Sequence, residues 1–232
     1  MSRRIVILFA LVLVMGACSR HSPTAPLATT ALVAGPAASS PAGAVGRFAW
    51  AWTHRDTAAY QSVLSDDFAF VFAPNDSAGN GFLGHLWGRR LEAAASGNLF
   101  WGGVSRPPAS DIQLTIDNLL VALSDPRPGK DPKWHRSIRT HVLLSITIDQ
   151  NGAPDLTTIQ GYALFYLVRG DSAALAPARV AAGGRDSTRW YIERWEDETA
   201  AANGAMANAL PTRSITWGAM KALYAPPPAR AR

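Results

Sequence analysis

The chain has 232 residues, of which 48% are hydrophobic and 17% charged; this composition supports a packed core and excludes a largely disordered protein. The formal net charge is +5 and the basic residues are scattered, so binding to nucleic acid is not expected. The single cysteine, Cys18, excludes an intramolecular disulfide.

The first 17 residues have the layout of a secretory signal: a basic start, a short apolar run, and small residues before Cys18. The sequence Met15-Gly16-Ala17-Cys18 resembles the bacterial lipobox, with Met15 where leucine is usual. The resemblance implies that Cys18 carries acyl chains, palmitate among them, and anchors the mature protein in the cell envelope, at the outer membrane if the organism has one. The alternative is an ordinary signal peptide with an incidental cysteine.

Residues 18–43 are rich in alanine, serine and proline and are expected to form a flexible tether. A globular domain over residues 44–199 should follow. It leads to a C-terminal extension, 200–232, with a short helix at 211–224 and a frayed tail. The side chains of this helix expected to face inward are Trp217, Met220 and Tyr224.

Two helices and a strand are predicted at the start of the domain. The helical spacing i, i+3, i+4, i+7 is shown by Val45, Phe48, Ala49 and Trp52. Asp56 should cap a second, short helix. Residues 65–67 are expected to form a turn, and residues 68–72 a strand with three phenylalanine rings on one face.

A third helix is predicted over residues 85–96, with Gly97-Asn98 as its stop signal. On this helix Arg89 and Glu92 stand three positions apart, a spacing typical of a solvated ion pair on the exposed side. Both residues are therefore assigned to the face that contacts water.

Strands dominate the remainder of the domain. They are predicted near residues 112–116, 142–148, 159–168 and 190–195. Asn151-Gly152 is a hairpin turn signal between the second and third of them. A polar loop is expected over residues 124–133. The strand at 159–168 is apolar on both faces, so both faces should be covered.

This order predicts a single α+β domain in which antiparallel strands carry helices on one side. This element order, together with the side chains of three segments, resembles the nuclear transport factor 2-like superfamily and its SnoaL-like branch. The three segments are Phe48–Phe72, Trp87–Phe100 and Arg189–Asp197. The resemblance covers about residues 44–199. It implies a cone-shaped, cystatin-like architecture, a curved antiparallel sheet wrapped around helices with an internal pocket. The superfamily includes isomerases, dehydratases and non-catalytic binders, and fold alone does not choose among them.

Aromatic residues are dense where the resemblance implies a pocket. The pocket-lining candidates are Trp52, Tyr60, Phe70, Phe72, Trp87 and Trp190. Such a cavity suits an apolar or flat ligand, and the alternative is that the rings fill a small core. Steroid-isomerase-like relatives carry a catalytic aspartate near the end of the first strand. Here residues 70–73 contain no acid, which argues against that mechanism.

The catalytic candidates are Glu193 and Tyr166. Strand alternation places Glu193 between two aromatic residues, where a raised pKa would suit a general acid or base. The alternative is that the Glu193 carboxylate has a structural role and forms a salt bridge with Arg139 or Arg169.

Histidines offer no metal site at ligand spacing. His135 and His141 share a strand face, but they lie roughly 20 Å apart on an extended strand, too far for one ion. No metal and no cofactor are therefore predicted. His141 is expected to point away from the pocket, on the outer face of the sheet.

The sequence therefore favours a membrane-anchored envelope protein that is not an enzyme. Its domain would bind a small apolar ligand or a partner protein, and the apolar outer face of strand 159–168 suggests a homodimer through that face. One alternative is a cofactor-free isomerase or dehydratase that uses Glu193 or Tyr166. Another is a structural protein whose cone is filled.

Overall fold

The computed structural model describes eight ranges of the chain: residues 34–74, 76–82, 86–103, 106–150, 152–173, 175, 186–200 and 212–226. The predicted signal and Cys18 lie outside these ranges. The helices and strands that the structure describes belong to one compact unit, Gly35–Arg232. None of the helices within the described ranges is long and apolar enough to cross a membrane.

The unit contains short helices and long strands. The helices are α1 (Pro41–Thr53), α2 (Thr57–Ser62), the 3-10 helix η1 (Ser77–Phe82), α3 (Arg89–Trp101) and α5 (Trp217–Tyr224). The strands are β1 (Leu64–Val71), β2 (Trp87–Gly88), β3 (Ala109–Ile116), β4 (Leu123–Ser124), β5 (His135–Gln150), β6 (Ala153–Gly170), β7 (Asp186–Ala200) and β8 (Thr212–Ser214).

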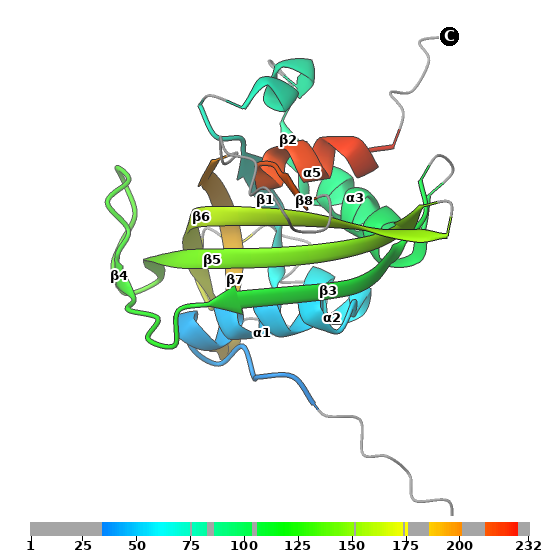
Figure 1. Cartoon of the computed structure of the whole chain (residues 1–232). Helices are drawn as coiled ribbons and strands as arrows, with labels where there is room; N and C mark the ends of the chain where they lie inside the picture. Colours follow the sequence, from blue (N-terminus) through cyan, green and yellow to red (C-terminus); the bar gives the residue numbers. More distant parts are fainter. Residues whose placement is uncertain are drawn as a thin grey trace, which may run out of the picture. The chain divides into compact units, whose positions relative to one another are not determined.

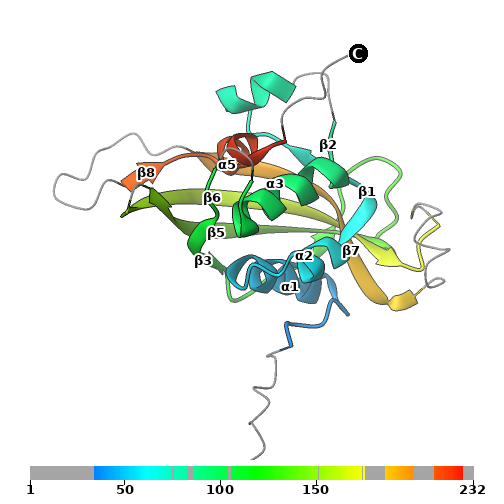
Figure 2. The same cartoon turned by 90° about the vertical axis from the view of Figure 1, so that its right-hand side faces the viewer.

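The strands form one curved sheet in the order β2-β1-β7-β6-β5-β3, with β4 added to β5 and β8 to β6. Figure 1 shows β5 and β6 sweeping across the sheet while β7 turns behind them. In Figure 2, α3 lies between α5 and the α1–α2 pair, on one side of the sheet. This arrangement confirms the predicted α+β cone.

Two strand pairs depart from the predicted antiparallel pairing. The pairs β1–β7 and β6–β8 are parallel, and the other pairs are antiparallel. Only a tight hairpin forces two strands to run antiparallel. The members of each parallel pair are far apart in the chain, so their direction is set by packing.

Helix α1 lies inside the curve of the sheet. Its N-cap, Ser40, accepts a hydrogen bond from the Gly43 amide at 2.9 Å. The ring of Phe48 lies 5.1 Å from those of Phe165 and Trp195 on the inner face of the sheet, centroid to centroid. The predicted apolar stripe of α1 is therefore the centre of the core.

The cap predicted for the second helix is confirmed, because Asp56 Oδ1 accepts a hydrogen bond from the Ala59 amide at 2.8 Å. The turn predicted at residues 65–67 is wrong. These residues belong to β1, where the pairing with β7 is irregular between Leu64 and Ala69. A strand irregularity tolerates turn-forming residues without ending the strand.

The third helix begins and ends later than predicted. Trp87 belongs to β2, and α3 runs through Gly97 to Trp101, where Gly102 follows with φ of 95°. A Cβ on Gly97 would face open space, so no close contact requires a glycine here. Relative to alanine, glycine reduces helix stability by only about 1 kcal/mol. The buried side chains of the next turn, Leu99 and Phe100, contribute about 1.5–3 kcal/mol each and outweigh it.

The hairpin predicted around Gly152 joins β5 to β6, and Gly152 has a φ of 81°. The outer face of β6 is covered only towards its end. Val168 and Tyr166 are 1% and 6% exposed, whereas Tyr162 is 40% exposed. The prediction that both faces of this strand are covered therefore holds for one half of it.

Candidate functional site

A buried ion pair joins α3 to α5 inside the cone. Glu92 and Lys221 are 1% and 3% exposed, and Lys221 Nζ donates to Glu92 Oε1. The same carboxylate accepts hydrogen bonds from the Tyr60 hydroxyl and, at 2.7 Å, from Trp87 Nε1. These four residues, which we call the interior cluster, come from four different elements of the fold.

The prediction that Glu92 faces water is wrong. The buried positions of α3 are Glu92, Ala95, Ser96, Leu99 and Phe100. They follow the i, i+3, i+4, i+7, i+8 pattern of a buried stripe, and a carboxylate stands at its first position. The charge of Glu92 therefore hid the true buried face of the helix.

The ammonium group of Lys221 lies against two aromatic rings. Its Nζ is 4.2 Å from the ring centroid of Phe70 and 3.8 Å from that of Trp195. Burial lowers the pKa of Lys221 to about 8, against the opposing effect of Glu92 and Asp197. Burial also raises the pKa of Tyr60 well above its ordinary value, so this hydroxyl stays a proton donor to Glu92.

Hydrogen bonds hold α5 at both ends. Asp197 Oδ2 accepts from the Gly218 amide at 2.7 Å, and the Thr216 hydroxyl caps the first turn. At the other end, Asn98 Nδ2 donates to the Tyr224 carbonyl at 2.9 Å. Lys221 is therefore placed on Glu92 by a helix that is fixed to both β7 and α3.

Helix α5 separates two spaces. On its inner side, a small cavity of about 10 Å³ is bordered by Trp52, Leu99 and Met220. On its outer side, an open cleft of about 570 Å³ is bordered by Asp76, Thr216 and other residues near the end of β1. With α5 in place, this inner cavity is too small for a ligand.

The predicted pocket rings divide into two groups. Those that gather in the interior are Trp52, Tyr60, Phe70 and Trp87, all buried. Phe72 is half-buried beside them and stacks on Phe82, with 5.5 Å between ring centroids. Trp190 is buried in the same hydrophobic core, and its amide donates to the Ala38 carbonyl at 2.8 Å. The rings fill a core, as the alternative interpretation of the sequence allowed.

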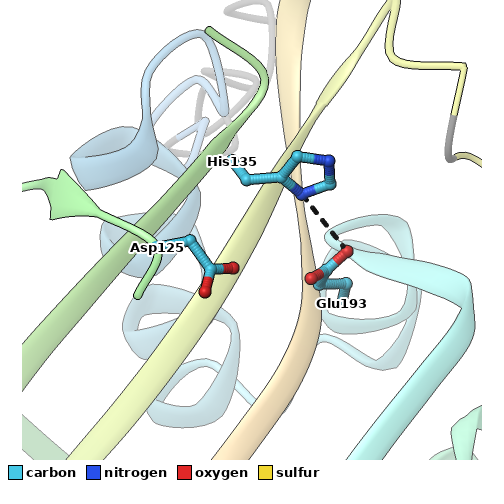
Figure 3. Close-up of side chains that lie close together, drawn as sticks. All are labelled: Asp125, His135 and Glu193. Carbon is cyan, nitrogen blue, oxygen red and sulfur yellow. Dashed lines mark ion pairs between the residues drawn. The ribbon is translucent and has the colours of Figure 1, made fainter. Parts of the chain in front are cut away.

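A second polar cluster lies on the outer face of the sheet. Figure 3 shows Asp125, His135 and Glu193 converging there, and one ligand atom of each lies within 4.8 Å of the others. Carboxylate and imidazole groups at this spacing are typical of a metal site. However, Arg127 donates to both carboxylates, and Lys130 Nζ lies 2.9 Å from Glu193 Oε1. Two side-chain cations already occupy the place that a metal would need.

Glu193 pairs with neither arginine considered from the sequence. Arg139 pairs with Glu198, and Arg169 with Asp171. A register shift in β7 turns Glu193 toward the segment that precedes β5, and this segment supplies Arg127 and Lys130 instead. A third partner, His135, lies with Nδ1 3.6 Å from Glu193 Oε2, and burial lowers the pKa of this imidazole (Figure 3). Because Arg127 and Lys130 are cations, Glu193 is placed as a structural anion.

The other catalytic candidate, Tyr166, also lies on the outer face. Its ring lies 4.0 Å below the Arg127 guanidinium, and burial raises the pKa of its hydroxyl. His141 was predicted to face away from the pocket. Its ring centroid lies 5.5 Å from that of Tyr162, whose side chain is 40% exposed. The sequence placed residues 124–133 in a polar loop and carried no signal that they fold back on Glu193.

The curved sheet that encloses helices is the architecture that the sequence resemblance implied. One similar structure is a nuclear transport factor 2-like superfamily protein from Salmonella enterica, with 12% identity, a TM-score of 0.41, and coverage of 72% of this chain and 92% of that one. Another is a conserved protein from Planctomyces limnophilus, with 18% identity, a TM-score of 0.43, and coverage of 68% and 91%. A hexachlorocyclohexane dehydrochlorinase is similar at 10% identity, with a TM-score of 0.45 and coverage of 72% and 86%. No known family model and no curated protein matches the sequence.

Proposed function

We propose that this protein is a lipid-anchored envelope component whose cone binds a small, largely apolar molecule without transforming it. The observation that supports the proposal is the interior cluster: one carboxylate, Glu92, set among aromatic rings and closed off by α5. Small-molecule sites are typically apolar and aromatic, with a few fixed polar groups. The anchor at Cys18 rests on the lipobox resemblance.

Helix α5 occupies the place that the ligand would take. The Trp217 ring lies 5.1 Å from that of Trp52 and 4.5 Å from that of Trp195. The buried indole N–H groups of Trp195 and Trp217 find no acceptor in the described part of the chain. A ligand would exchange with α5, and its oxygen or nitrogen atoms could accept from Trp195 on the cone wall.

The cluster is better suited to binding than to proton transfer. Glu92 already accepts hydrogen bonds from three donors, Tyr60, Trp87 and Lys221. A carboxylate in this state is a poor general base, because each new proton would have to displace a donor. This arrangement favours the non-enzymatic interpretation.

A glycine in α5 offers a way to test the exchange. A Cβ on Gly218 would lie 2.4 Å from Asp76 Oδ2 and 2.5 Å from Phe72 Cδ1, so Gly218→Ala should loosen α5. We expect this variant to bind the neutral apolar dye N-phenyl-1-naphthylamine about tenfold more tightly than the unaltered protein, a difference of about 1.4 kcal/mol. The matched control is Gly97→Ala, where the new Cβ meets open space.

Native mass spectrometry of the protein purified from its own host provides the second measurement. A retained small molecule, present at higher occupancy in Gly218→Ala, would support the proposal. An empty protein whose dye affinity is the same in both glycine variants would contradict it.

A further inference from the structure

The ammonium group of Lys221 occupies a site that the rest of the cone builds. Glu92 comes from α3, Phe70 from β1 and Trp195 from β7, and Nζ lies within 4.2 Å of both ring centroids. Ring faces and a carboxylate together are the usual means by which proteins bind organic cations. Only the cation itself belongs to α5.

The charge balance of the interior restricts what could replace Lys221. Lys221 is the cation that the described residues place on Glu92, and Tyr60 and Trp87 are neutral donors. Asp197, 3% exposed, adds a second carboxylate nearby. If α5 withdrew in favour of a neutral ligand, Glu92 would lose its counterion, and this loss weakens the binding of neutral ligands relative to cationic ones.

We infer that the ligand of the cone is an organic ammonium compound with an apolar or aromatic body, and that Lys221 is its intramolecular competitor. This inference rests on the proposed function. The ligand's ammonium group takes the place of Lys221 Nζ between Glu92 and the rings of Phe70 and Trp195. Its apolar body takes the volume filled by Trp217 and Met220, both at most 2% exposed.

The test compares a cation with a neutral molecule of nearly the same shape. Full-length protein at pH 7 is titrated with 2-phenylethylammonium or with 2-phenylethanol, and binding is followed by calorimetry. We expect the ammonium compound to bind at least tenfold more tightly. Hydrogen exchange of residues 217–224 should become faster when it binds, because α5 is displaced.

Two variants separate ligand recognition from a structural role of the pair. Lys221→Met keeps the apolar stem and removes the competing cation, so affinity for 2-phenylethylammonium should rise about tenfold. Glu92→Gln/Lys221→Met removes both charges, a change that buried ion pairs often tolerate. This double variant should bind the amine and the alcohol equally. Circular dichroism shows whether each variant is folded, and the two-ligand comparison on the unaltered protein stands without them.

The outcomes distinguish the inference from the proposed function. Equal binding of amine and alcohol by the unaltered protein overturns the inference and leaves a small-molecule binding function intact. If neither compound binds to the unaltered protein or to folded Lys221→Met at millimolar concentration, the inference is also overturned. In that case, a host-purified protein that retains no molecule contradicts the proposed function as well.

Discussion

A single lysine makes the stability of the cone depend on pH. Burial lowers the pKa of Lys221 to about 8, whereas a lysine in an unfolded chain titrates near 10.4. Between these values the unfolded state binds a proton that the folded state has lost, so the free energy of unfolding rises with pH. We expect a gain of about 2 kcal/mol between pH 8 and 9.5, and none from this residue below pH 7.

Urea unfolding at pH 7, 8 and 9.5 measures this effect. The matched variant, Lys221→Met, should lose the rise, and an equal rise in the variant would contradict the assignment to Lys221. The series should stop at pH 9.5 because tyrosines titrate in the unfolded chain near pH 10. Burial raises the pKa of Tyr60, so above pH 10 this residue would oppose the lysine effect.

At this scale, apolar residues could be predicted from the sequence and charged ones could not. Phe48 and Trp52 follow helical periodicity and are buried as expected. Glu92 and Lys221 stand 129 positions apart, so no local pattern connects them. From sequence alone, a charged residue is predicted to lie at the surface unless its partner is known. For this reason the sequence did not predict the interior cluster.

At the scale of elements, side-chain ion pairs hold the segment that precedes β5 against the sheet. Arg127 bonds both Asp125 and Glu193, whose side chains are 0% and 8% exposed. Arg127→Met would remove the cation that contacts both of these buried carboxylates. Since the arginine itself is 24% exposed and partly screened, we expect a loss of about 2–3 kcal/mol in the free energy of unfolding.

The control for this experiment is the exposed pair Arg139–Glu198, whose side chains are 52% and 34% exposed. Arg139→Met should reduce stability by less than about 1 kcal/mol in the same denaturant titration. Equal losses in the two variants would mean that the outer cluster adds no more than a surface ion pair. Hydrogen exchange over residues 119–134 should rise in Arg127→Met alone.

The existence of elements could be predicted more readily than their contacts. The terminal helix was expected over residues 211–224, but residues 212–214 form β8 and α5 begins at Trp217. Its predicted inward side chains, Trp217, Met220 and Tyr224, are all buried. Its position could not be predicted, because α5 is placed by Asp197 and Asn98, which belong to distant elements. The sequence placed the helix in an extension beyond the cone domain of residues 44–199, whereas the structure packs it into the cone.

At the scale of the whole molecule, element order predicted an α+β domain, and the family resemblance implied its cone shape. A run of helices followed by long strands permits few layered arrangements, and a curved sheet that encloses helices is one of them. Element order does not determine whether the cone is hollow. Here the eight residues of α5 pack into the interior, and the cavity that Met220 and Lys221 border measures about 10 Å³.

The proposed envelope location rests on Cys18, and a substitution there tests it. Each acyl CH₂ buried in a bilayer contributes about 0.8 kcal/mol, and two or more chains make attachment stable. The full-length protein, expressed in its host, should partition into the membrane fraction, with a mature mass that includes acyl chains. Cys18→Ser should release it. Met15→Leu, which restores the usual lipobox residue, should leave it attached. A Cys18→Ser protein that stays with the membrane would refute the anchor and leave the binding function of the cone to be judged on its own tests.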